Sequence, residues 1–317
     1  MLIPKIPLHV LNNGRTIPII GLGTWQSAAN GEVYQAVCDA IVAGYRHLDC
    51  AFVYENQTEI GQAINDSIRN NIVKREDLFI TSKIWLTYYT KERMLKCAKL
   101  ILDQLQLNYI DLLLLHYPIS LLQQDDNLRP IDSKGRAIDG GIDYLDAYRS
   151  LELLVDHGMV RSIGVSNFTI KQIDRLLANV RIKPVTNQVE SHPYLNQMSL
   201  KEYCNTNEIV LTAFSPLGNP GSARNKSPDK DMLLRDPVVV RLAKKYSKNE
   251  GQILIKFQVQ NGNLVIPKSV RKSRIISNID VFDFQLTKSE MDELLSLDRN
   301  YRTCRFAFAS HLPEYPF

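Results

Sequence analysis

Cysteine is scarce in this chain, and the spacing of the few cysteines excludes several kinds of site. The 317 residues contain five cysteines, an odd number, at positions 38, 50, 97, 204 and 304. No two of them form the Cys-x-x-Cys motif that zinc sites and redox centres use. We therefore expect free thiols in a reducing compartment, for which the cytoplasm is the default.

Long apolar runs are missing as well, and the excess of positive charge is small. No stretch is long enough to cross a membrane, and prolines and Lys5 interrupt the N-terminal residues where a signal peptide would have its apolar core. A net charge of +4 is too small to indicate nucleic-acid binding, although it suits a small anionic ligand. We expect a cytoplasmic protein with no membrane or nucleic-acid partner.

No linker rich in proline, glycine or serine divides the chain, so the sequence predicts one domain that spans residues 1–317. Eight short apolar runs alternate with helical patterns, which is typical of an α/β protein with a parallel sheet. These runs are Ile19–Leu22, His47–Asp49, Leu78–Ser82, Tyr109–Leu115, Arg161–Val165, Val185–Val189, Ile209–Ala213 and Leu264–Ile266. Eight repeats predict a (β/α)8 TIM barrel; the alternative is an open doubly wound sheet with two domains.

Two local patterns agree with a barrel. The sequence Asn-Asn-Gly-Arg at positions 12–15 separates the apolar runs His9–Leu11 and Thr16–Ile20. Asn-Gly in this setting is a strong signal for a β-hairpin, which we expect to cap the bottom of the barrel. Apolar residues from Val33 to Ile41 recur at the spacing of one helical face.

Three long segments, 119–141, 217–235 and 299–317, lack a periodic pattern. Loops of this length in a compact domain are usually functional or disordered. The first two follow predicted strands, so we expect them on the C-terminal face, where barrel enzymes keep their active sites. The third carries five aromatic residues that need burial: Tyr301, Phe306, Phe308, Tyr315 and Phe317. We expect this tail to line the barrel mouth; the alternative is a tail packed on the outer helices.

Polar side chains follow or close most of the predicted strands. In chain order they are Asp49, Lys83, His116, Ser166 with Asn167, Gln188 with Glu190, Ser215, and Lys268 with Ser269. Because the carboxyl ends of barrel strands converge on one mouth, this pattern predicts a site lined by hydrogen-bonding groups.

Tyr54, five residues after Asp49, completes a candidate proton-transfer site. A buried Lys83 needs an anionic partner, and Asp49 on the adjacent strand is the available carboxylate. An ammonium near Tyr54 would favour tyrosinate and lower the pKa of the phenol from its ordinary value of about 10. Tyr54 could then act as a general acid, and His116 would orient a carbonyl oxygen or share the proton relay.

Two other chemistries fit these residues less well. His47 and Asp49 would share one face of a strand and, with Cys50 and His116, offer metal ligands. No recognised metal-binding spacing occurs, however, so we predict no metal site. Schiff-base chemistry on Lys83 would need a neutral lysine, and Asp49 would instead hold the ammonium charged.

Four cations lie within seven residues after the last predicted strand: Lys268, Arg271, Lys272 and Arg274. A strand–helix loop and the start of the next helix form a common phosphate site in barrels, so this cluster predicts binding of an ester phosphate. Gly-Leu-Gly at positions 21–23 is similar to the start of a dinucleotide fingerprint, but Gln26 stands where the third glycine is required.

These residues lie in motifs of a known family. The chain resembles the aldo-keto reductases, particularly the aldose and aldehyde reductases, over nearly all of its length. The motifs are Gly-Leu-Gly-Thr-Trp at 21–25, Gly-Tyr-Arg-His-Leu-Asp at 44–49, Gly-Met-Val-Arg-Ser-Ile-Gly-Val-Ser-Asn-Phe at 158–168, Asn-Gln-Val-Glu at 187–190 and Ile-Pro-Lys-Ser at 266–269. The resemblance implies a TIM barrel that binds NADPH without a Rossmann fold and acts on a small carbonyl substrate.

The resemblance also implies roles for individual residues. Tyr54 would donate a proton to the carbonyl, Lys83 and Asp49 would tune it, and His116 would orient the substrate. The residues expected at NADPH are Ser166, Asn167 and Gln188 on the nicotinamide carboxamide, Phe214 on its ring, Ser215 and Leu217 near the pyrophosphate, and Lys268, Ser269 and Arg274 on the 2′-phosphate, with Thr24, Trp25, Asp49 and Asn278 completing the site. Those expected at the substrate are Trp25, Trp85, His116, Tyr117, Cys304, Arg305 and Phe306.

Three positions differ from what many members of the family carry. Phe214 replaces a tyrosine, so stacking survives without the hydroxyl; Tyr117 replaces a tryptophan; Ser277 replaces an acid that helps to hold the adenine. The expected activity is NADPH-dependent reduction of aldehydes and ketones by a monomer. The alternatives are a reductase of steroid or prostaglandin ketones and a non-catalytic NADPH-binding barrel.

Overall fold

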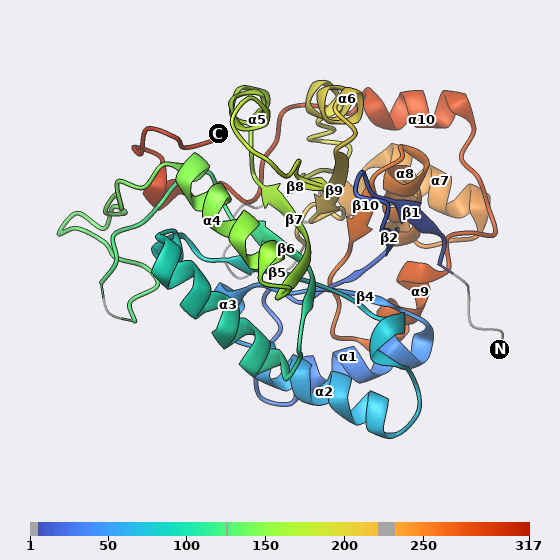
Figure 1. Cartoon of the computed structure of the whole chain (residues 1–317). Helices are drawn as coiled ribbons and strands as arrows, with labels where there is room; N and C mark the ends of the chain where they lie inside the picture. Colours follow the sequence, from blue (N-terminus) through green and yellow to red (C-terminus); the bar gives the residue numbers. More distant parts are fainter. Residues whose placement is uncertain (1–5, 125, 221–231) are drawn as a thin grey trace.

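The computed structural model describes residues 6–124, 126–220 and 232–317. In this part of the chain eight parallel strands form one sheet, β3 to β10, in which each strand pairs with the next along the sequence (Figure 1). Parallel bridges from Ile20 to Val265 and from Gly23 to Lys268 join the two edge strands and close the sheet. The predicted (β/α)8 barrel is confirmed, and the open doubly wound sheet is wrong.

The observed strands fall on the predicted apolar runs. They are β3 (Leu22–Gly23), β4 (His47–Asp49), β5 (Phe79–Ile84), β6 (Ile110–Leu115), β7 (Val160–Ser166), β8 (Thr186–Glu190), β9 (Val210–Phe214) and β10 (Leu264–Ile266). The first strand begins later than predicted. The N–H of Gly21 donates to the carbonyl of Val265, and the N–H of Val265 donates to the carbonyl of Ile19, so this segment closes the barrel before the regular strand begins.

Helices surround the sheet on its outer side (Figure 1). They are α1 (Glu32–Ala43), α2 (Gln57–Arg69), α3 (Lys91–Leu105), α4 (Tyr144–Asp156), α5 (Ile170–Leu177), α6 (Met198–Thr206), α7 (Pro237–Tyr246), α8 (Glu250–Gln260), α9 (Lys272–Ile279) and α10 (Lys288–Leu295). The apolar face predicted between Val33 and Ile41 is the buried face of α1. No helix of the described residues is both long enough and apolar enough to span a bilayer.

The predicted hairpin closes the N-terminal end of the barrel. Strands β1 (Leu8–Val10) and β2 (Thr16–Pro18) pair antiparallel. In the turn between them, Asn12 Nδ2 donates to the carbonyl of Pro184, 2.9 Å away, just before β8. Ile17 packs with residues such as Leu112 inside the barrel. The hairpin thus seals the end opposite the strand termini that carry the polar residues.

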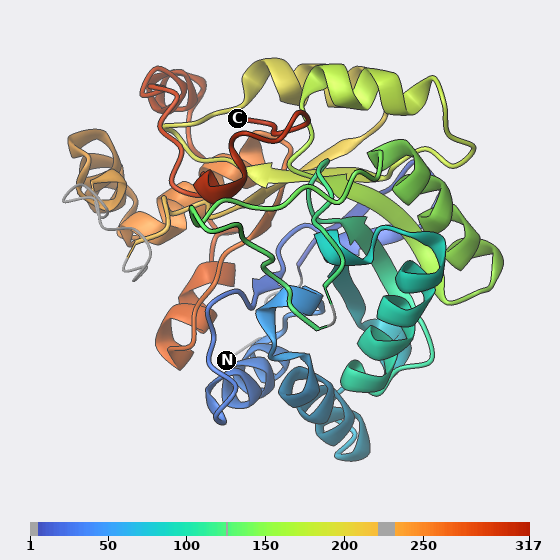
Figure 2. The same ribbon diagram turned by 90° about the vertical axis from the view of Figure 1, so that its left-hand side faces the viewer.

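The long loop after β6 and the C-terminal tail lie on the same side of the barrel, which faces the viewer in Figure 2. The backbone N–H of Ala137, in this loop, donates to the carbonyl of Phe308, in the tail. Further on, Gln172 of α5 donates to the carbonyl of Glu314. The tail therefore crosses the barrel mouth toward α5, as predicted. The alternative, a tail packed only on the outer helices, is wrong. Most of the predicted loop 217–235 lies outside the described residues.

Helix α2 starts three residues after Tyr54 and packs against the end of α3 at very short range. A Cβ atom on Gly61 would lie 2.5 Å from the carbonyl oxygen of Gln104 and 2.6 Å from that of Leu105. Both obstacles are backbone atoms that cannot rotate away. Gly61 therefore lets the two helices meet at this short range.

We predict that Gly61→Ala lowers the free energy of unfolding by about 1–3 kcal/mol, because the helices must separate. The matched control is Gly251→Ala in α8, where the nearest atom is the side-chain Oδ1 of Asn249 at 3.2 Å. There the better helix propensity of alanine should offset the contact to within about 1 kcal/mol. Urea unfolding measures both, and equal midpoints for the two variants would contradict the predicted close packing.

Candidate active site

A buried ion pair stands at the centre of the barrel mouth. Asp49 ends β4 and Lys83 lies near the end of β5, and both side chains are almost completely removed from solvent. Lys83 Nζ lies 2.6 Å from Asp49 Oδ1 and also donates to the carbonyl of Cys50 at 2.8 Å. The predicted pairing is confirmed. Schiff-base chemistry needs a neutral lysine, so this ion pair disfavours that alternative.

Asp49 is held from several strands at once. Its Oδ2 accepts a hydrogen bond from Gln188 Nε2 on β8 at 2.7 Å. Its backbone carbonyl accepts one from the hydroxyl of Thr24, after β3, at 2.8 Å. The carboxylate is therefore fixed across the width of the barrel, a link from Gln188 that sequence reasoning did not foresee.

Tyr54 reaches this pair from the short 3₁₀ helix Phe52–Tyr54 that follows β4. Its hydroxyl lies 3.4 Å from Lys83 Nζ. Loss of hydration raises the pKa of Tyr54 well above its ordinary value of 10.0, and the Asp49 carboxylate adds to this shift. The predicted lowering of this pKa is wrong, because burial of the phenol and the nearby Asp49 carboxylate both disfavour the tyrosinate. Tyr54 is a neutral phenol that can donate a proton.

His116 follows β6 and faces Tyr54 across the mouth. The two rings are in an edge-to-face arrangement with centroids 5.9 Å apart. Burial, with a contribution from the Lys83 ammonium, lowers the pKa of His116 well below its ordinary value of 6.5. The imidazole is therefore neutral, and it can donate one hydrogen bond to an oxygen atom held beside Tyr54.

Aromatic side chains form a wall next to these groups. Phe306, in the tail, stacks on Tyr117 with ring centroids 4.5 Å apart and meets Trp85 edge-to-face at 5.8 Å. Trp85 also packs edge-to-face on His116 and is held by a hydrogen bond from its Nε1 to the carbonyl of Leu128. The structure thus brings together most of the predicted substrate residues, whereas Arg305 is exposed to solvent.

Glu190, at the end of β8, anchors the tail to the barrel. One oxygen of its fully buried carboxylate accepts hydrogen bonds from the backbone N–H and the hydroxyl of Thr303, and the other accepts from the backbone N–H of Cys304 at 2.9 Å. His192 Nε2 lies 3.0 Å from the same carboxylate. In the sequence, Glu190 stood out only as an acidic residue at the end of a strand, with no cationic partner identified for it. This was the available signal for its role in anchoring the tail.

An amide-binding corner lies at the ends of β7 and β8. Asn167 Nδ2 donates to the carbonyl of His116 and to the hydroxyl of Ser166, which in turn donates to the carbonyl of Gln188. The Oδ1 atom of Asn167 is buried and has no hydrogen-bond partner in the described part of the chain. An orphaned buried acceptor favours a ligand that brings an N–H donor.

The other predicted cofactor residues form a path around the same rim. Phe214 ends β9 with a half-buried ring, and Ser215 and Leu217 follow it. Half-buried Trp25 follows β3. The segment between β10 and the end of α9 contributes Lys268, Ser269, Arg274 and buried Asn278. Arg274 is exposed, as an anion site at the surface requires. Lys272 instead pairs with Asp39 of α1 at 3.0 Å, so its ammonium already has a carboxylate partner.

The residues considered for a metal do not converge. His47 Nε2 hydrogen-bonds with Thr81 at 3.0 Å, and Asp49 is occupied by Lys83 and Gln188. Within residues 6–124, 126–220 and 232–317, no group of three or more His, Cys, Asp or Glu side chains is arranged to hold a metal ion. All five cysteines are free thiols.

Comparisons with known proteins agree with this geometry. A model of the aldo/keto reductase family matches residues 19–299. Aldo-keto reductase family 1 member C15 from Rattus norvegicus is 42% identical over 311 residues, which cover 97% of this chain and 96% of the relative.

Two solved structures have the same fold. An aldose reductase from Schistosoma japonicum has a TM-score of 0.91 and 41% identity, over 98% of each chain. An aldo-keto reductase from Bombyx mori, crystallised in complex with NADP, has a TM-score of 0.87 and 37% identity, over 99% of this chain and all of that one. By the family match and by these identities, the chain belongs to the aldo/keto reductase family, whose members are oxidoreductases acting on carbonyl compounds.

Proposed function

We propose that this protein uses NADPH to reduce aldehydes and ketones to alcohols, with Tyr54 as the proton donor. The observation that carries the proposal is the neutral Tyr54 phenol beside the buried Lys83 ammonium. A protonated phenol suits the reductive direction, in which the carbonyl oxygen must receive a proton. Trp85, Tyr117 and Phe306 provide an apolar wall where the organic part of the substrate would lie.

NADPH fits the residues around the rim. The carboxamide N–H group matches the buried Oδ1 of Asn167, and the half-exposed ring of Phe214 offers a face for stacking. Lys268, Ser269 and Arg274 lie beyond β10, where they would bind the 2′-phosphate. The relative from Bombyx mori binds NADP on the same fold, which supports this choice. When bound, NADPH supplies the hydride.

The side chains of the protein then have distinct tasks. His116 donates a hydrogen bond that holds the carbonyl oxygen next to the Tyr54 hydroxyl. Tyr54 transfers its proton to this oxygen as negative charge develops there. Lys83, 3.4 Å from the hydroxyl, stabilises the tyrosinate that remains. Asp49 keeps Lys83 in place and charged.

The substrate class follows from the shape and charge of the mouth. The aromatic wall favours aldehydes and ketones with an apolar or aromatic body, and the relative from Schistosoma japonicum is named an aldose reductase. Reduction of a steroid or prostaglandin ketone is the alternative from the sequence. A single domain spanning residues 1–317, a monomeric state and a cytoplasmic location remain predictions.

We predict that Tyr54→Phe lowers the kcat of aldehyde reduction by at least about 10²-fold, the usual contribution of a positioned acid. NADPH binding should be unchanged, because the cofactor contacts lie elsewhere. Tyr203→Phe in α6, whose hydroxyl bonds to Asp174, is the matched control and should retain full activity. Steady-state kinetics and a fluorescence titration with NADPH check both; near-normal turnover in Tyr54→Phe would contradict the assignment.

We predict a preference for NADPH over NADH that depends on Lys268 and Arg274. Each charge-assisted hydrogen bond to a phosphate contributes roughly 1.5–3 kcal/mol, so Lys268→Ala or Arg274→Ala should weaken NADPH binding about tenfold or more. NADH binding should change little, and the exposed Lys288→Ala in α10 should affect neither cofactor. Equal losses for NADPH and NADH would remove these cations from the 2′-phosphate.

We predict that Phe306→Ala changes the ranking of substrates by about tenfold in kcat/KM, because an aromatic contact and its buried area are lost at the wall. Arg305→Ala is the neighbouring comparison. Its side chain is exposed, and an exposed charge contributes about 0–1 kcal/mol, so it should leave the ranking of neutral aldehydes unchanged. A panel of neutral and carboxylate-bearing aldehydes measures both. An unchanged ranking in Phe306→Ala would place the tail outside the substrate pocket.

A further inference from the structure

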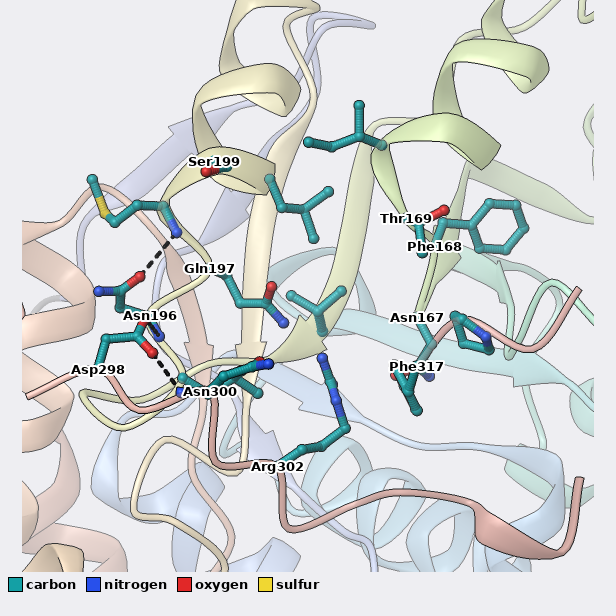
Figure 3. A pocket seen from close by; sticks show the side chains of 16 residues that line it. Asn167, Phe168, Thr169, Asn196, Gln197, Ser199, Asp298, Asn300, Arg302 and Phe317 are labelled. Carbon is teal, nitrogen blue, oxygen red and sulfur yellow. Dashed lines mark hydrogen bonds between the residues drawn. The ribbon is translucent and has the colours of Figure 1, made fainter. Parts of the chain in front are cut away.

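A second pocket lies beside the tail. Arg302 lines it, whereas the anchored Thr303–Cys304 segment that follows Arg302 does not. Its cavity is about 400 Å³, within the range that holds a small organic ligand. The starts of α5 and α6 line it on one side, and the chain around Asp298–Arg302 together with Phe317 lines it on the other (Figure 3). The residues assigned to catalysis do not line it; Asn167 alone of the cofactor residues does.

Arg302 places a cation in this pocket. In Figure 3 its side chain rises from the tail into the space between Gln197 and Phe317. The guanidinium carbon lies 3.8 Å from the centre of the Phe317 ring. Nη1 is buried and has no hydrogen-bond partner among the described residues. Burial lowers the pKa of Arg302, and the negative charge of Glu190 offsets only part of this effect.

The acidic groups near Arg302 use their hydrogen-bonding capacity on other residues. Asp298 lines the pocket, but its two carboxylate oxygens accept hydrogen bonds from the backbone N–H groups of Asn196 and Asn300. Glu190, whose negative charge also acts on Arg302, is bonded to His192, Thr303 and Cys304. The N-terminal ends of α5 and α6 add partial positive charge at the pocket. The helix ends and the free Nη1 of Arg302 thus leave hydrogen-bonding capacity for an anion, whose binding must outweigh repulsion from Asp298 and Glu190.

Apolar side chains make up much of the remaining lining. Val189, Leu195, Leu200 and Phe317 are among them. A ligand that matches both the Arg302 guanidinium and the apolar lining needs a flat anionic group and a small apolar body. A carboxylate has this geometry, since it can accept two parallel N–H bonds from one arginine.

We propose that this pocket is a second binding site, separate from the carbonyl site, for small organic acids with an apolar or aromatic body. Arg302 binds the carboxylate, and the body lies against Val189, Leu200 and Phe317. Phe317 in turn contacts Tyr117 edge-to-face, with ring centroids 6.3 Å apart, so the occupant lies one side chain away from the substrate wall.

The test is a ¹⁹F NMR titration of the full chain with 4-fluorobenzoate, and with the neutral 4-fluorobenzamide as ligand control. Arg302→Gln removes the guanidinium. Ser199→Trp fills the pocket from an exposed position in the first turn of α6, so it tests the site even if Arg302→Gln does not fold. Arg149→Gln, the same change on the exposed surface of α4, is the matched control.

The wild-type protein and Arg149→Gln should bind 4-fluorobenzoate equally, with or without saturating NADP⁺. Arg302→Gln and Ser199→Trp should each bind it at least about tenfold more weakly, the value of a charge-assisted bond, and the benzamide should bind weakly to all. Binding that persists in both pocket variants but is lost in His116→Phe, or is lost with NADP⁺, would place the acid in the active site and overturn the proposal. Failure of the wild-type protein to bind the probe, or equal binding of the benzamide, would also overturn it.

Discussion

The buried ion pair between Asp49 and Lys83 is the interaction on which the rest of the site depends. Two charges removed from water are tolerated when each is paired and its remaining hydrogen-bonding capacity is used. Here the carboxylate binds both Lys83 and Gln188, and the ammonium also binds the carbonyl of Cys50. The pair therefore connects β4, β5 and β8, and it fixes the point from which Tyr54 is positioned.

Low hydration sets the protonation states around this pair. It keeps the phenol of Tyr54 protonated and the imidazole of His116 neutral, with the pKa of the first raised and that of the second lowered. One group then holds the proton that a carbonyl oxygen needs, and the other can only orient that oxygen. Glu190 completes the arrangement by fixing the tail, and with it Phe306, over the mouth.

The sequence predicted what depends on local patterns and on barrel topology. Polar residues at strand ends, such as Asp49, Lys83 and Gln188, had to converge once the strands closed into a barrel. It failed where the outcome depends on distances of a few ångströms. The direction of the Tyr54 pKa shift depends on how deeply the phenol is buried and on how near it lies to the Asp49 carboxylate, and the pairing of Lys272 with Asp39 depends on how α9 packs on α1. Neither is encoded in a motif.

The central claim is that the ion pair acts on catalysis through Tyr54. Single-turnover rates of aldehyde reduction at saturating NADPH test it in a cycle of the neutral-pair variant Asp49→Asn/Lys83→Met, Tyr54→Phe, and their combination. Replacing both charges avoids leaving one of them buried and unpaired. Neutralising the pair should slow the reaction by about 10²-fold with Tyr54 present, within the range for general acid catalysis, and have little further effect in Tyr54→Phe. The same factor in both backgrounds would show that the pair and the tyrosine act independently and would contradict the account.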